Sequence, residues 1–158
     1  MAPERDDHVA TPILVDGFEA AYDRFRSSVA GTAEAFHALV EVLAWAGTLG
    51  DRLGEDRPPL LQGLYYMRNV VLHQGVDVLH WIFIPVGMLG SMKMGPTSPP
   101  HQSWSWPLAG EFEPPRSRGE KPPAGEEEYE SLLAGKDAVT TLRQTCSALR
   151  NLPAGLGT

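Results

Sequence analysis

The sequence predicts an all-α protein: a four- to five-helix up-and-down bundle with a long proline-rich arm before its C-terminal helices. Three observations support this prediction. Apolar residues recur with helical spacing over residues 18–29, 36–49, 60–72 and 139–149. No stretch alternates in the way that a half-buried strand does. Residues 94–123 hold eight of the fourteen prolines, so we expect neither a regular helix nor a sheet there.

The first two helices are predicted from apolar stripes and capping residues. Asp16 is the expected N-cap of the first helix, and Gly31 is expected to end it. Thr32 is expected to cap the second helix. The stripe of the first helix consists of Phe18, Tyr22, Phe25 and Val29. In the second helix the inward side chains are Phe36, Leu39, Val40, Leu43 and Leu49, and the outward ones are Glu34, Glu41 and Asp51.

A turn at GEDRPP (54–59) precedes the third predicted helix, because proline is tolerated in a first helical turn. This helix is expected to run from Leu60 at least to Gln74, where Gly75 either caps it or bends it. The apolar segment 76–84 fits a helix or a buried strand. We favour a helix, because the sequence offers no other strand with which it could pair.

The C-terminal part returns to a helical pattern at Tyr129, which breaks at Gly135 and resumes after Asp137. EEEYE (126–130) is typical of an acidic first turn, which the helix dipole favours. Trp104 and Trp106 alternate in SWSW, so an extended backbone points both rings to one side. These rings are candidates for contacts with RNA bases or a partner, and also for docking the arm onto the bundle.

Composition and charge narrow the class of protein. The 158 residues fit one domain, 1–158, with 94–123 as its arm. The net charge of −7 argues against a broad, charge-driven grip on nucleic acid. The acidity is uneven, however: residues 1–56 hold 11 acidic and 4 basic side chains, whereas residues 57–93 hold Arg57, Arg68 and Lys93 against Asp77 alone. A small basic cleft is therefore compatible with the sequence.

The single Cys146 excludes a disulfide framework and fits a reducing, cytoplasmic setting. The N-terminus MAPERDDHVATP lacks the apolar region of a secretory signal, and the longest apolar run is too short to span a bilayer. No set of His, Asp and Glu has the spacing of a metal site. We therefore expect no membrane association, no metal and no cofactor.

The stretch YYMRNVVLHQGVDVLHW (65–81) places Arg68, Asn69 and His73 in an otherwise apolar run. An arginine is almost never buried without a partner, because removing its charge from water is costly. In a helix Asn69 and His73 share one face, and Arg68 lies roughly 140° round and ~7.5 Å along the axis from His73. The row of Asn69 and His73 extends to Gln62, Tyr66 and, if Gly75 leaves the helix intact, Asp77.

These residue types suit chemistry on a phosphate. Arginine supplies a forked cation that matches phosphate oxygens, and histidine accepts or donates a proton near neutral pH. Asn69 is expected to position either group by hydrogen bonding, and Asp77 to hold His73 in one tautomer. Tyr66 is a further supporting candidate on the same row.

RNVVLH (68–73) fits the R-x4-H signature and resembles the HEPN superfamily (higher eukaryotes and prokaryotes nucleotide-binding). That superfamily consists of small all-helical domains, many of them metal-independent endoribonucleases of toxin–antitoxin and antiviral systems. The resemblance covers the motif and, more loosely, the helical plan of residues 16–92 and 126–152. Some members carry a tyrosine target for adenylylation two residues after the histidine, where this chain has Gly75.

The resemblance implies a role for each residue of the motif. Arg68 would bind and neutralise the scissile phosphate, and His73 would act as general base or acid while the 2′-hydroxyl attacks and a 2′,3′-cyclic phosphate forms. Asn69 would support them. The resemblance also implies RNA as the substrate, a homodimer whose two motifs converge on one cleft, and a toxin or defence effector with an antitoxin or other protein partner.

Two other hypotheses remain open at this stage. In one, the chain is a noncatalytic helical interaction or scaffold module, with Arg68 paired to a carboxylate such as Asp77. In the other, the same Arg/His pair serves a nucleotide-binding sensor.

Overall fold

The structure, a computed structural model, describes residues 7–29, 31–75, 79, 82–84, 103–114 and 123–152. Its secondary structure is almost entirely helical, and the predicted all-α bundle is confirmed. The elements in chain order are α1 (Asp7–Ser27), α2 (Ala33–Leu53), the 3-10 turn η1 (Gly54–Asp56), α3 (Pro59–Gln74), β1 (Ile82–Ile84), β2 (Ser103–Ser105), the 3-10 turn η4 (Ala109–Glu111), α4 (Glu126–Glu128), the π-helical turn η5 (Tyr129–Leu133) and α5 (Ala138–Arg150).

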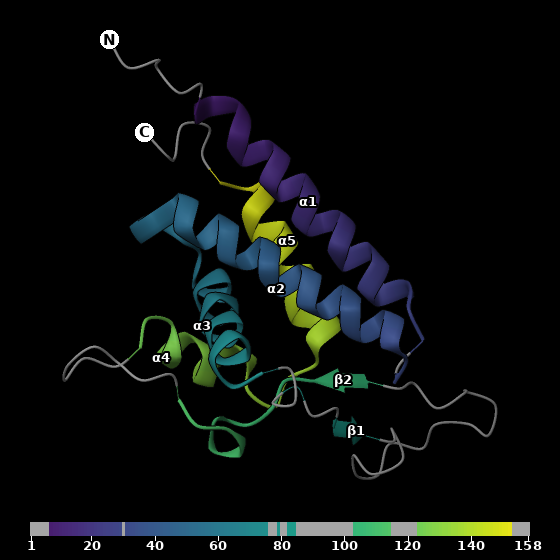
Figure 1. Ribbon diagram of the computed structural model, residues 1–158. Coiled ribbons are helices and arrows are strands. Elements are labelled where there is room, and N and C mark those ends of the chain that lie inside the picture. Colours follow the sequence, from purple (N-terminus) through teal and green to yellow (C-terminus); the bar gives the residue numbers. More distant parts are fainter. Residues whose placement is uncertain are drawn as a thin grey trace, which may run out of the picture.

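The long helices α1 and α2 lie antiparallel along one another, with α5 packed behind them and α3 leading away from the end of α2 (Figure 1). The other side of α3 packs against α4 and η5. One core joins all of these elements, and its largest fully buried side chains are Trp106, Tyr66, Tyr129, Phe18, Phe25, Leu43, Leu49, Leu61, Leu64, Met67, Leu133 and Leu142. Among the helices that the structure describes, none is both long and apolar enough to cross a membrane.

The first helix begins earlier than the sequence indicated. α1 starts at Asp7, so the expectation that Asp16 caps it is wrong. The reason is that Leu14 and Val15 continue the apolar stripe by one more turn and pack against the core, although Pro12 lies in the same helix. Val29, expected at the other end of the stripe, is instead 69% exposed and lies beyond the last residue of α1.

The predicted helix ends around α2, α3 and α5 are confirmed. Thr32 caps α2 by accepting a hydrogen bond from the backbone N–H of Ala35, and Asp137 caps α5 in the same way through Thr140. Gly75, at a φ of 87°, ends α3 and donates its backbone N–H to the carbonyl of Val71. The helix thus ends at Gln74, before Asp77, whose position lies outside the described residues.

The segment 76–84 does not form the expected helix in its described part. Leu79 lies outside regular structure, and Ile82–Ile84 form β1, which pairs antiparallel with β2 in the register Ile82↔Ser105, Phe83↔Trp104 and Ile84↔Ser103. The expectation of no regular structure in 94–123 is likewise wrong for Ser103–Ser105. The partner strand β2 lies inside the proline-rich segment, and the high proline content of that segment had argued against any strand there.

The stretch 103–114 is held against the bundle by backbone hydrogen bonds at Trp106. Its N–H donates to the carbonyl of Lys136 at 3.0 Å, and its carbonyl accepts from the N–H of Gly135 at 3.0 Å. The indole N–H of Trp106 donates to the buried hydroxyl of Thr141 at 2.7 Å. This part of the predicted arm is therefore packed against the bundle and belongs to the fold.

The contact between α3 and the start of α4 predicts a sensitive position at Gly125. Its φ is 87°, and a Cβ there would lie 2.2 Å from the backbone carbonyl oxygen of Gln62. Because neither the backbone conformation nor the space accepts a side chain, Gly125→Ala should cost about 2–4 kcal/mol and lower the melting temperature by roughly 5–10 °C. Gly110→Ala is the matched control, since nothing lies within 4 Å of its added Cβ. Equal melting temperatures for the two variants would contradict this packing.

Candidate functional site

Arg68 lies half-buried on α3 and is held by two side chains of the same helix. Its Nη1 donates a hydrogen bond to Oδ1 of Asn69 at 2.9 Å, and its Cζ lies 6.0 Å from the centre of the Tyr65 ring. Within the described parts of the chain, Arg68 forms no ion pair with a carboxylate. Most of its five N–H donors therefore remain available to an anion.

Other arginines of the bundle are engaged by carboxylates. Arg24 pairs with Glu41, Arg26 with Asp23, and Arg150 with Glu19. These three pairs lie on the surface of α1, α2 and α5, where such pairs contribute little to stability but do neutralise charge. Arg68, like Arg57 and Arg143, forms no ion pair with a carboxylate within the described residues, and of these three it is the one that lies in the R-x4-H motif.

The position of Arg68 depends on two glycines of α2. A Cβ on Gly47 would come 2.7 Å from Nε of Arg68, and a Cβ on Gly50 would come 2.4 Å from Cδ2 of Tyr65. Real Cβ atoms do not approach other atoms so closely, so any larger residue would push these side chains outward. Gly47 and Gly50 are spaced i, i+3 and lie on one face of α2, where they form the surface on which Tyr65 and Arg68 rest.

His73 lies in the last turn of α3 and its side chain is exposed. In an α-helix Asn69 lies 100° round from Arg68, and His73 lies roughly 140° round, so Asn69 stands between them. The Arg68 guanidinium is bonded to Asn69 and lies on Tyr65 and α2, whereas His73 lies five residues further along the helix. The two groups thus stand on one helix, the guanidinium on its middle part and the imidazole in its last turn.

A second arginine, which the sequence analysis did not single out, joins this surface. Cζ of Arg57 lies 4.5 Å from the centre of the Tyr65 ring. Its Nε donates to the carbonyl of Gly54, and its own carbonyl accepts from Nε2 of Gln62 at 3.1 Å, so the residue is fixed on both sides of the turn. The sequence signal was present but weak: an arginine between a turn and the first residues of α3.

Tyr65 joins the two arginines. Its hydroxyl donates to Oδ1 of Asp51 at 2.8 Å. That hydrogen bond, with partial burial and the charge of Asp51, raises the pKa of the phenol above its ordinary value, while Arg57 and Arg68 oppose the rise. Tyr65 is therefore neutral at physiological pH and serves as an aromatic surface beside both guanidiniums.

Tyr66, a supporting residue predicted from the sequence, does not lie on this surface. The Tyr66 ring is 2% exposed and packs between Phe112 and Tyr129 at centroid distances of 6.3 and 5.4 Å. Burial, followed by the charge of Glu126, raises the pKa of Tyr66. Tyr66 thus belongs to the contact between α3 and η5, on the inner side of the helix. Asp77 lies outside the described residues.

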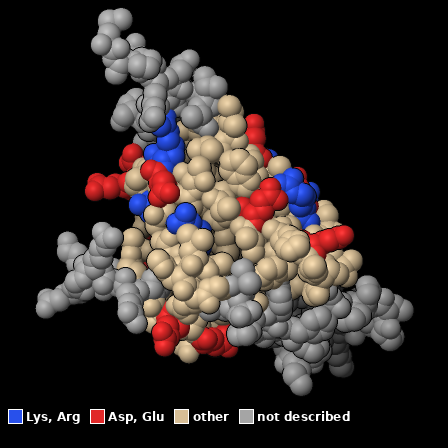
Figure 2. Space-filling view, in the orientation of Figure 1, with Lys and Arg blue, Asp and Glu red and all other residues tan. Residues whose placement is uncertain are grey.

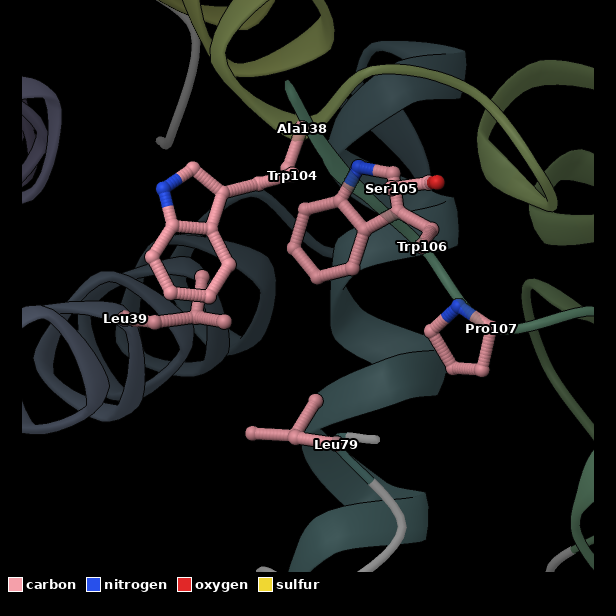
Figure 3. A pocket seen from close by; sticks show the side chains of 7 residues that line it. All are labelled: Leu39, Leu79, Trp104, Ser105, Trp106, Pro107 and Ala138. Atoms are coloured by element: carbon pink, nitrogen blue, oxygen red, sulfur yellow. The ribbon is translucent and has the colours of Figure 1, made fainter. Parts of the chain in front are cut away.

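Trp104 and Trp106 are buried at 7% and 1% exposure. Figure 3 shows the two indole rings next to one another, with Leu39 of α2 against Trp104 and Leu79 below them, around a small apolar cavity. Trp104 also approaches Phe25 of α1 at 5.9 Å between ring centres. The two rings lie on one side and dock on the bundle, as one of the two expectations had it. Because other residues of the protein cover their faces, the rings are not exposed for stacking on RNA bases.

Charge over the molecule is mixed. Figure 2 shows basic and acidic side chains side by side on the face in view, with a wide area between them that carries neither. An acidic hollow, lined by Gln62, Pro123, Ala124, Gly125, Glu126, Glu127, Glu128 and Glu130, lies at α4. By contrast, residues 57–75 contain two arginines and no acidic side chain. An anionic ligand would therefore be less disfavoured along the Arg57–Arg68 side of α3, where Asp51 offsets part of the positive charge, than at α4, where the charged residues lining the hollow are all acidic.

The parts of the chain that the structure describes bring together no group of three or more His, Cys, Asp and Glu side chains able to hold a metal ion. Comparisons with protein-family models, with curated proteins and with solved structures found no match to this chain.

Proposed function

We propose that the protein is a metal-independent endoribonuclease of the HEPN type, which cleaves RNA in the cytoplasm as a toxin or defence effector. The observation that carries the proposal is the presence on one helix of Arg68, a guanidinium bonded to Asn69 and without a described carboxylate partner, and of the exposed His73. The exposure of His73 also supports it, since a general base must be within reach of the substrate.

In the proposed reaction Arg68 binds the scissile phosphate. His73 removes the proton from the 2′-hydroxyl, whose oxygen attacks the phosphorus. The bond from phosphorus to the 5′-oxygen breaks, and that oxygen takes a proton from water while His73 returns its own proton to the solvent, so that the products are a 2′,3′-cyclic phosphate and a 5′-hydroxyl. Arg68 stabilises the additional negative charge on the phosphate oxygens in the transition state. Asn69 holds Arg68 in place and takes no part in proton transfer.

The test is cleavage of mixed RNA by purified protein in excess EDTA, with analysis of the product ends. The protein should leave 2′,3′-cyclic phosphates, and His73→Ala should lower the rate by about 10²–10⁴-fold, because proton transfer in the transition state contributes about that much. His37→Ala is the matched control, since His37 is also exposed but lies on α2. The melting temperatures of both variants should stay within a few degrees of the wild type.

Other outcomes have distinct meanings. Cleavage that EDTA abolishes, or that His73→Ala and His37→Ala affect equally, would contradict the proposed chemistry. Binding of RNA or nucleotides without cleavage would favour the sensor, and the absence of both binding and cleavage would favour the noncatalytic module. Growth arrest on expression, absent with His73→Ala, would support the toxin or effector role.

The proposal includes a homodimer whose two copies of α3 lie near each other. The exposure of Leu72 supports this dimer. Its side chain is 63% exposed, and it lies one turn beyond Arg68 on the same side of the helix. An exposed leucine in such a position fits a self-complementary interface. Leu79, by contrast, is 5% exposed in the core of its own chain, so at this residue the apolar segment 76–84 is not a free surface.

Sedimentation at micromolar concentration should therefore show a dimer. Leu72→Asp should shift it toward the monomer and lower the cleavage rate, because a buried charge opposes association. Val29→Asp is the control, since Val29 has a similar exposure of 69% but lies after α1, away from α3. A wild-type monomer, or a dimer that Leu72→Asp leaves intact, would contradict this interface.

A further inference from the structure

The pair of arginines on Tyr65 points to a binding position beyond the motif. Arg57 and Arg68 come from different elements, one after η1 and one from the middle of α3, yet both guanidiniums approach the same ring, at 4.5 and 6.0 Å from its centre. Like charges repel, so two arginines gathered at one aromatic ring are unfavourable unless something offsets the repulsion. Asp51, at the hydroxyl of Tyr65, offsets part of it.

The side chain of Arg57 is held in place, but its charge is not paired with a carboxylate among the described residues. Within the described residues its side chain bonds only to the backbone carbonyl of Gly54 and lies on Tyr65, and it forms no ion pair, even though Glu55 and Asp56 are its neighbours in sequence. Its Nη atoms therefore keep donors for an anion. Because both guanidinium carbons lie within 6.0 Å of the centre of one ring, the two cations are close enough to contact neighbouring phosphates of one strand.

We propose that Arg57 binds a second phosphate of a single-stranded RNA, next to the phosphate held by Arg68, and that Tyr65 keeps the two cations at a fixed separation. This inference rests on the proposed function, since it takes Arg68 as the site of the scissile phosphate. The substrate class that follows is an RNA strand with at least one phosphate beyond the scissile one, running along α3 toward η1.

A substitution at Asp51 should change RNA affinity in the opposite direction to a substitution at Arg57. Its carboxylate lies within this cluster and repels a phosphate there. Asp51→Asn removes the negative charge, and the amide oxygen can still accept the hydrogen bond from Tyr65. Arg57→Ala and Asp51→Asn should therefore change RNA affinity in opposite directions, a pattern that general loss of structure does not produce.

The experiment measures binding of a fluorescent, single-stranded 2′-O-methyl RNA, which cannot be cleaved because its 2′-oxygen carries no proton. Affinity is measured at several salt concentrations. Arg57→Ala should weaken binding roughly tenfold and reduce the salt slope by about 0.7, the value expected for one lost phosphate contact on a single strand. Asp51→Asn should strengthen binding. Arg57→Lys, which keeps the charge, should retain most of the slope.

Arg143→Ala is the control for loss of one surface charge, because Arg143 is exposed on α5. It should leave the slope unchanged. If wild type binds the RNA and Arg57→Ala has the same affinity and slope, or if Arg143→Ala loses as much, the second phosphate position is overturned while the proposed function stands. If wild type does not bind the RNA at all, the proposed function fails together with this inference.

Discussion

The close contact of α3 with α2 over Gly47 and Gly50 is the constraint on which the candidate site depends. Arginine and tyrosine are large side chains, and between packed helices they would ordinarily hold the helix axes apart. Two glycines at i, i+3 remove the side chains that would meet them, so Tyr65 and Arg68 lie directly on the backbone of α2. Glycine in a helix interior costs about 1 kcal/mol relative to alanine. In return, the two glycines leave room for Arg68 and Tyr65 at defined positions beside the core.

The remaining contacts of α3 fix the orientation of the helix and therefore which of its side chains face outward. The inner side of the helix is fixed by Tyr66, which packs on η5 and leaves Arg68 and Asn69 toward the outside. The start of the helix is fixed by the turn that holds Arg57, and its end by Gly75. Arg57, Arg68 and His73 therefore lie within one stretch of chain, residues 57–75, that contains no acidic residue, on a protein whose net charge is −7. This local distribution, rather than the total charge, makes a phosphate ligand reasonable.

The sequence was informative where a structural signal is local. Helical periodicity, the caps at Thr32 and Gly75 and the resumption of the pattern after Asp137 are properties of a few neighbouring residues, and they predicted α2, α3 and α5 well. It failed where the determining partner is distant. The strand at Ile82–Ile84 exists because Ser103–Ser105 pairs with it, and nothing within 82–84 identifies that partner. For the same reason the motif residues could be named, while the cluster of Arg57, Tyr65 and Asp51 became visible only when α2 and η1 were placed beside α3.

The most direct test of this account is nitrogen-15 NMR of the arginine side chains in Gly47→Ala. The Nε–Hε signal of Arg68, assigned by its loss in Arg68→Ala, should shift strongly, because the new Cβ would lie 2.7 Å from that Nε and must displace it. The melting temperature should hold or rise, since alanine favours the helix by about 1 kcal/mol. Thr48→Ala, at the exposed neighbouring position, should leave the signal in place. An unchanged Arg68 signal in Gly47→Ala would show that Arg68 does not rest on α2, and it would contradict the account.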